Sequence, residues 1–152
     1  MITCTKHYAD FPFAHRQPSH DGHCALIHGH NWGFEFEFQA ARLDECGFVI
    51  DFGKLKWLKE WLAERFDHTL VLNHSDPMLR YMRQALDAQP GDRGEPVLAK
   101  IVAVPDCSCE GLAVFLMERV NGLLSEQTDG RVSLARVRVI EDSKNHCDIH
   151  AD

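Results

Sequence analysis

The sequence predicts one α+β domain, in which an antiparallel sheet is covered by helices on one face. Residues 28–39 alternate strictly between apolar and polar, whereas leucines recur at helical spacing after residue 51 and again after residue 108. A chain of 152 residues suits a single domain, which we place at 1–152, and it is long enough to bury a core.

The two N-terminal strands carry the clearest apolar faces. We expect a strand over 2–15 with Phe11, Phe13 and His15 on one face, and Pro12 implies that this strand lies at an edge or contains a bulge. The second strand covers 28–39. Its apolar face consists of Trp32, Phe34, Phe36 and Phe38. Two further strands are expected over 97–104 and 131–141.

Three helices are predicted from their start signals. Asp51 is a plausible N-cap for a helix that runs to about residue 65. The motif 75–77 (Ser-Asp-Pro) begins a shorter helix, which ends before a loop over 89–96. Ser108 caps the third helix, whose apolar residues recur at helical spacing as far as Leu123.

Composition excludes several classes of protein. The net charge of −7, with no basic cluster, argues against nucleic-acid binding. No apolar run is long enough for a membrane span, and the N-terminus lacks the apolar region of a signal peptide, so we expect a cytoplasmic protein. The six cysteines lack CxxC spacing, which favours reduced thiols over a disulfide scaffold or a zinc finger.

Histidine is the unusual residue, with ten in the chain and five between His15 and His30. His28 and His30 share the parity of Trp32, so both imidazoles face the apolar side, and Gly29 between them fits a crowded approach of two rings to one ion. His15 could complete a site with three nitrogens and an open fourth position, which is typical of catalytic zinc. Copper, nickel and iron also accept imidazole, and buried core histidines are the alternative.

Cys24 lies four residues before His28, in a loop that approaches this predicted metal. A thiolate near a cation can act as a base or nucleophile, but a fourth zinc ligand or an inert buried thiol fits equally well. His20 and His23 lie in the same loop and are expected to be solvated.

Three further groups could serve catalysis. In Asp67-His68 the carboxylate could orient the imidazole, although a histidine interacting with a helix C-terminus is the simpler explanation. Glu141 has the parity of a core-facing residue and could bind two donors of a flat heterocycle, unless it is an exposed strand end. Glu110 falls in the first turn of the third helix, where the dipole favours an acid without any function.

The set of motifs resembles the 6-pyruvoyltetrahydropterin and 6-carboxytetrahydropterin synthase family. The matching pieces occur in family order across nearly the whole chain: Phe13-Ala14-His15-Arg16, Cys24 to Asn31 (CALIHGHN), Val49 to Lys56 (VIDFGKLK), Asp67-His68, Glu110 and Val137 to Glu141 (VRVIE).

The resemblance implies a zinc ion at His15, His28 and His30 and a catalytic Cys24 that accepts a proton. It also implies that Asp67, His68 and Glu141 act as relay and pterin-anchoring groups, with Glu110 in the pterin pocket. The fold would be the tunnelling fold, in which strands of several subunits close into barrels, usually as a homohexamer with active sites at subunit interfaces. A small pterin would be the substrate.

The short spacer between Cys24 and His28 resembles the carboxy-forming branch of the family. That branch converts 7,8-dihydroneopterin triphosphate into 6-carboxy-5,6,7,8-tetrahydropterin, acetaldehyde and triphosphate, on the way to queuosine and other deazapurines. The alternatives are a pyruvoyl-forming synthase, cleavage of a related pterin, or a non-catalytic oligomer that binds zinc or pterin.

The sequence departs from the family at several points. The segment 107–110 (Cys-Ser-Cys-Glu) replaces the family's Pro-Thr-x-Glu, and 76–96 is an extra helix and loop. Because the chain is acidic, Arg16 or Lys54 would have to offset the charge of a triphosphate. The tail with His146, Cys147 and His150 is expected to be a solvated terminus.

Overall fold

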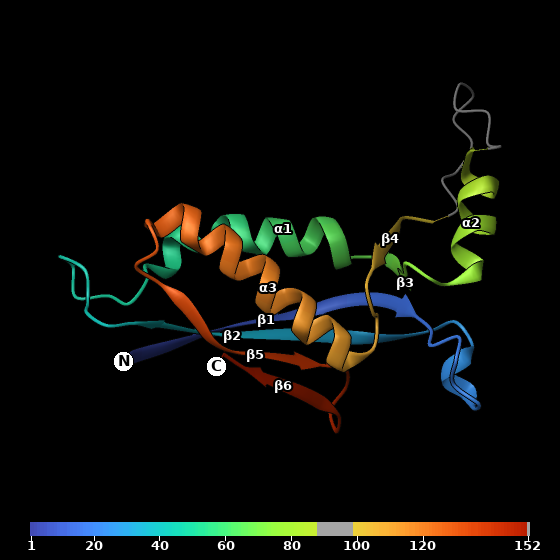
Figure 1. Cartoon of the computed structure of the whole chain (residues 1–152), viewed down its shortest axis with the longest axis horizontal. Coiled ribbons are helices and arrows are strands. Elements are labelled where there is room, and N and C mark those ends of the chain that lie inside the picture. Colours follow the sequence, from blue (N-terminus) through green and yellow to red (C-terminus); the bar gives the residue numbers. More distant parts are fainter. Residues whose placement is uncertain (88–98, 152) are drawn as a thin grey trace.

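The structure, a computed structural model, describes residues 1–87 and 99–151, and it is an α+β fold (Figure 1). The strands are β1 (Ile2–His15), β2 (His28–Ala40), β3 (Thr69–Asn73), β4 (Ile101–Val104), β5 (Ser133–Ile140) and β6 (His146–His150). The helices are α1 (Lys56–Phe66), α2 (Pro77–Asp87) and α3 (Cys109–Thr128), and the 3-10 turns are η1 (His23–Ala25) and η2 (Phe52–Leu55).

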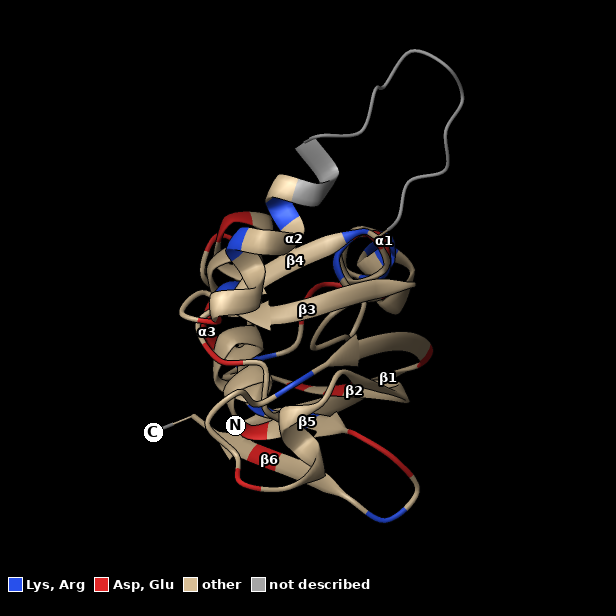
Figure 2. Ribbon diagram, turned by 90° about the vertical axis from the view of Figure 1, so that its right-hand side faces the viewer, with Lys and Arg blue, Asp and Glu red and all other residues tan. Residues whose placement is uncertain are grey.

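The strands form one curled sheet in the order β4-β3-β1-β2-β5-β6, and α1 and α3 lie over one face of it (Figures 1 and 2). The pairs β1–β2 and β2–β5 are antiparallel, in agreement with the predicted antiparallel sheet, and β5 also pairs antiparallel with β6. The pairs β1–β3 and β3–β4 are parallel, which the sequence did not predict. The sheet is therefore mixed, with an antiparallel part that carries the longest strands.

The core lies between the sheet and the two long helices. The aromatic face of β2 predicted from alternation is fully buried, with Trp32, Phe34, Phe36 and Phe38 at 0% exposure. Leucines of α1 and α3 at helical spacing pack on this face, among them Leu58, Leu62, Leu112 and Leu116. The amphipathic patterns thus place one continuous core beneath both helices.

A bulge interrupts the β1–β2 pairing between Tyr8 and Phe11, where Asp10 has a φ of 66°. It lies just before Pro12, as expected of a proline in a strand, but β1 is an interior strand and not an edge. Pro12 still accepts a hydrogen bond from His68 N–H through its carbonyl. The bulge resets the register so that the last residues of β1 face the first residues of β2.

The caps predicted from sequence are present. Asp51 accepts from Gly53 N–H and starts η2, which continues into α1, so the regular helix begins later than predicted. Ser108 accepts from Gly111 N–H at the start of α3, and Asp76 accepts from Met78 N–H at the start of α2.

Two strands were not predicted, and one begins later than predicted. β3 is absent from the prediction, and the tail expected to be a solvated terminus instead forms β6 along β5. β4 begins at Ile101 and not at 97. The predicted loop over 89–96 and residues 97 and 98 lie outside the described residues, within which no helix is long and apolar enough to cross a membrane.

Candidate metal centre

Three imidazoles converge where β1 ends and β2 begins. The antiparallel register places His15 directly opposite His28, and Phe13 opposite His30. One nitrogen from each of the three rings lies within 4.8 Å of the others, so the group could hold a metal ion. Strand parity had placed these side chains on the core face, and the structure brings them together there.

In two of the three rings, a backbone carbonyl selects which nitrogen is free. His15 Nδ1–H donates to the carbonyl of Cys107 at 2.8 Å, and His28 Nδ1–H donates to the carbonyl of Leu26 at 2.7 Å. Each bond leaves a lone pair on Nε2. In ligating histidines the second ring nitrogen is held in this way, which fixes the tautomer and the orientation of the ring.

Two buried nitrogens have no hydrogen-bond partner among the described residues: Nε2 of His15 and Nε2 of His30. A buried polar atom without a partner is costly, so it signals a group that the protein is built to bind. Three imidazole nitrogens with a free position suit a divalent cation, and this donor set therefore fits a zinc ion.

Burial also keeps His15 in the form that a metal needs. The side chain is 5% exposed, and this burial lowers the pKa of His15 to about 4, with the neighbouring His28 and His30 adding to the effect. At neutral pH the ring is uncharged and its Nε2 can coordinate.

Glu141, just after β5, is the carboxylate nearest to this cluster. Its Oε1 lies 3.6 Å from Nε2 of His15 and 3.6 Å from Nε2 of His30. The predicted core-facing parity of Glu141 is therefore confirmed. A molecule bound at the open side of the three nitrogens would meet this carboxylate.

Gly29 has a different role from the one expected. A side chain at this position would point away from the rings of His28 and His30, because alternate residues of a strand point to opposite faces. A Cβ there would lie 3.2 Å from the carbonyl oxygen of Phe13 on β1. Glycine therefore allows close contact with the β1 backbone, and the two rings do not require it.

Cys24 lies in η1, half-buried, in the segment that leads into β2. It is not part of the three-nitrogen group, so the structure does not bring its thiol into the ligand set. The segment is nevertheless attached to the metal centre, since His28 bonds the carbonyl of Leu26. His20 and His23 are exposed, as predicted.

Four other cysteines are held as thiols. Burial raises the pKa of Cys4, Cys107, Cys109 and Cys147, in the case of Cys109 to about 12. The thiols of Cys107 and Cys109 donate to backbone carbonyls. These four side chains are therefore poor bases at neutral pH.

Asp67 and His68 do contact each other, with Oδ1 2.6 Å from Nδ1. His68 has a φ of 52°, and its side chain is 81% exposed. It lines a surface depression of about 580 Å³ together with Gly29 and with His30, one of the three converging histidines. Asp67 and His68 are therefore already in contact within one chain, but His68 is not one of the residues of the three-nitrogen group.

Glu110 is exposed in the first turn of α3, as the sequence predicted. Its carboxylate lies near β6, where it adds to the effect of burial in raising the pKa of Cys147. Glu141 likewise adds to the effect of burial in raising the pKa of Cys109 at the start of α3. The two acids thus flank the same end of the helix.

Arg16, which with Lys54 was expected to offset the charge of a triphosphate, is paired with a carboxylate of the same chain. Its Nε and one terminal nitrogen bind the carboxylate of Asp76, at 2.8 Å and 3.1 Å, and its other terminal nitrogen donates to the carbonyl of Ala25. Three of the five N–H donors of the guanidinium are thus engaged inside the chain. Lys54 remains exposed.

The sequence analysis missed the groups that orient the imidazoles. The carbonyl of Cys107 is 92 residues from His15, and the amide of Asn73 fixes Cys107 by accepting from its N–H at 2.6 Å. No local pattern reveals such contacts. Only the unusual Cys-Ser-Cys before α3 marked this segment as different.

Comparison with known proteins identifies the fold and the family. The family model described as "6-pyruvoyl tetrahydropterin synthase" matches residues 3–152. An uncharacterised protein from Wolinella succinogenes has a similar structure, with a TM-score of 0.82, 19% identity and coverage of 99% of this chain and 98% of the other. The 6-pyruvoyltetrahydropterin synthase of Plasmodium vivax follows with a TM-score of 0.68, 19% identity and coverage of 100% and 99%.

Curated relatives match shorter stretches. A 6-carboxy-5,6,7,8-tetrahydropterin synthase of Rickettsia conorii is 42% identical over 77 residues, which is 50% of this chain and 55% of that protein. The protein of the same name from Synechocystis is 28% identical over 77% of this chain and 97% of its own length. The chain thus spans about half the length of the first of these relatives. Because the family model matches almost every residue, the chain belongs to the 6-pyruvoyl tetrahydropterin synthase family.

Proposed function

We propose that this protein is a zinc-dependent 6-carboxy-5,6,7,8-tetrahydropterin synthase. The substrate would be 7,8-dihydroneopterin triphosphate and the products 6-carboxytetrahydropterin, acetaldehyde and triphosphate, as a step towards queuosine and other deazapurines. The observation that carries the proposal is the set of three converging imidazoles, two of them with unpartnered buried nitrogens, in a chain of this family. The names of the relatives support the carboxy-forming branch.

In this proposal His15, His28 and His30 hold the zinc ion through Nε2. When bound, zinc supplies a Lewis acid that polarises the hydroxyl groups of the substrate side chain. The protein contributes the geometry: two rings are fixed by backbone carbonyls, and the edge of Trp32 closes the buried side of His15.

Cys24 is the proposed proton acceptor. Its segment is bonded to the ligand His28 through Leu26, and it is half-buried beside the open end of the sheet. Four of the other cysteines are held as thiols by burial, which supports Cys24 as the reactive one.

In this proposal Cys24 accepts one proton from the substrate, and the pair Asp67 and His68 returns one to it. The carboxylate lies 2.6 Å from Nδ1, so it can stabilise a protonated ring. Because the exposed His68 is not part of the three-nitrogen group, this pair would serve a site that a second copy of the chain completes. This arrangement supports a homo-oligomer, which we propose to be a hexamer on the family resemblance.

Glu141 and Glu110 are the proposed pterin anchors. Two parallel N–H donors of a pterin match a carboxylate, and Glu141 lies 3.6 Å from two of the metal-binding nitrogens. An anchored ring would place its side chain at the open metal position, which is the positioning effect that such a reaction needs.

The direct experiment is to incubate the zinc-loaded protein with 7,8-dihydroneopterin triphosphate and identify the products by mass. We expect a carboxy product together with one equivalent of acetaldehyde. Triphosphate release without acetaldehyde would instead favour a pyruvoyl-forming synthase and would contradict the carboxy-forming assignment. Absence of turnover in a zinc-loaded hexamer would favour a protein that only binds zinc or pterin.

The matched variant is Cys24→Ala. We expect it to retain zinc but to lose turnover by about 10²-fold or more, as is typical when a general base is removed. If turnover were unchanged while zinc stayed bound, the role assigned to Cys24 would be wrong.

A further inference from the structure

Three consecutive carbonyls hold the segment that carries Cys24. The carbonyl of Cys24 accepts from the backbone N–H of Gln17 at 2.8 Å, that of Ala25 accepts from Arg16 at 3.3 Å, and that of Leu26 accepts from His28 Nδ1–H. The first two donors follow directly after the metal-binding His15 and the third is itself a metal-binding residue. The cysteine segment is therefore tied to both ligand-bearing strands.

The donor from Arg16 depends on a buried carboxylate far away in the sequence. Asp76 is 60 residues from Arg16, its side chain is 0% exposed, and its two oxygens accept two parallel hydrogen bonds from the guanidinium. Such a pair gives a fixed orientation, because the planar fork sets the direction in which the remaining terminal nitrogen, Nη1, points. That direction is towards the carbonyl of Ala25.

Asp76 also begins α2, since its Oδ1 accepts from the N–H of Met78 at 2.8 Å. The helix α2 is therefore anchored by the same carboxylate that orients Arg16.

We propose that Asp76 and Arg16 are positioning residues, which hold the Cys24 segment against the metal centre. The proposal rests on the function assigned above to Cys24. It predicts that the pair controls the placement of the thiol without contributing a ligand to the metal or a contact to the substrate.

The first test is Asp76→Asn in the zinc-loaded protein. Asparagine keeps the oxygen that caps α2 but lacks the charge that fixes Arg16. We expect iodoacetamide to alkylate Cys24 roughly tenfold faster, measured by peptide mass spectrometry, since one charge-assisted hydrogen bond is weakened. We also expect kcat to fall by roughly tenfold with KM nearly unchanged and one zinc ion retained per chain.

A double variant separates positioning from stability. Asp76→Asn leaves Arg16 partly unpaired, which destabilises the fold, whereas Arg16→Met with Asp76→Asn removes the buried charge altogether. We expect the double variant to regain the melting temperature but to keep the fast alkylation of Cys24 and the low kcat. If the alkylation rate of Cys24 and kcat returned to those of the unchanged protein together with the melting temperature, the proposal would be overturned.

The control is Arg138→Gln. Arg138 makes a similar two-bond contact with Asp148, at 2.8 Å for both bonds, on the uncovered face of the sheet. We expect alkylation of Cys24 to stay within twofold of the unchanged protein. If Arg138→Gln accelerated alkylation as much as Asp76→Asn, the specific link to Asp76 would be refuted.

Alkylation also distinguishes this proposal from the proposed function. If the unchanged protein had no turnover, the proposed function would fail, but the alkylation rates would still report on the placement of Cys24. If alkylation stayed within twofold in every variant, the positioning proposal would fail while the catalytic assignment stood.

Discussion

Each of the three histidines of the candidate metal centre is positioned by a different physical constraint. His15 is buried and donates to a carbonyl 92 residues away, His28 donates to a carbonyl two residues before it, and His30 has a buried nitrogen with no partner among the described residues. Strand parity alone indicates which side chains share a face. It could not indicate that the carbonyl of Cys107 fixes the tautomer of His15, because this contact depends on the packing of the loop before α3 against β1.

At the same scale, His68 combines an exposed imidazole with a left-handed backbone, φ 52°. We expect His68→Asn to fold normally, because asparagine tolerates this conformation, and to lose about 10²-fold of turnover with the imidazole. His68→Val should instead lower the free energy of unfolding by about 1–2 kcal/mol through backbone strain. Urea unfolding and kcat measure the two effects, and unchanged turnover in His68→Asn would contradict the relay.

At the scale of elements, periodicity was informative where an element has one buried face. The strands β1 and β2 and the helices α1 and α3 were predicted for this reason. β3 was missed because four of its five residues are buried, so its short sequence does not alternate. β6 was missed because it is short, polar and recognisable only through its pairing with β5.

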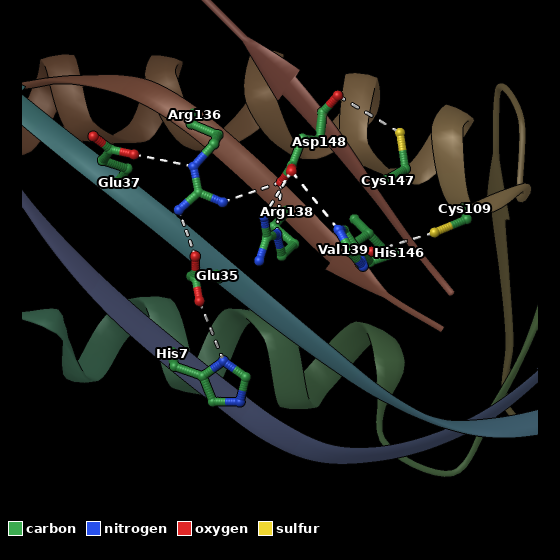
Figure 3. A network of polar contacts seen from close by, with 10 residues as sticks. All are labelled: His7, Glu35, Glu37, Cys109, Arg136, Arg138, Val139, His146, Cys147 and Asp148. Carbon is green, nitrogen blue, oxygen red and sulfur yellow. Dashed lines mark hydrogen bonds and ion pairs between the residues drawn. The ribbon is translucent and has the colours of Figure 1, made fainter. Parts of the chain in front are cut away.

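Ion pairs on the uncovered face join β2, β5 and β6. Arg136 binds Glu35, Glu37 and Asp148, and Arg138 also binds Asp148 (Figure 3). Hydrogen bonds from Arg138, and then from Arg136, lower the pKa of Asp148 to about 2. In the unfolded chain the pKa of this aspartate is near its ordinary value of 3.8, so the ionised carboxylate stabilises the fold above about pH 4.

This contribution is lost as the pH falls from about 4 to about 2, because protons then bind the unfolded chain first. We expect Asp148→Asn to lower the free energy of unfolding at pH 7 by about 1 kcal/mol, after allowance for solvent screening of a side chain 25% exposed. Urea unfolding at several pH values checks this. If the variant and the unchanged protein lost stability equally between pH 4 and pH 2, the assignment would be wrong.

At the scale of the whole molecule, the surface carries an apolar groove of about 510 Å³ at the far end of the sheet from the metal centre. Four of its lining side chains are large and more than 40% exposed: Ile2, Leu43, Phe48 and Phe52. A contiguous apolar patch of this kind is typical of a protein interface. It supports the proposed assembly of several copies of the chain.

We therefore expect Phe48→Asp to reduce the mass of the particle in light scattering after size exclusion, because a charge would be buried in the interface. The control is Tyr81→Asp, at an aromatic residue 67% exposed on α2, outside the groove. An oligomer of unchanged mass in Phe48→Asp would exclude this groove as the contact between copies.

The central claim is that the three imidazoles hold one metal ion, and the metal content of the purified protein tests it most directly. Elemental analysis should find close to one zinc ion per chain. The double variant His28→Ala with His30→Ala should contain almost none, because it removes two of the three nitrogens that lie within 4.8 Å of one another. An unchanged zinc content in that variant would contradict the account.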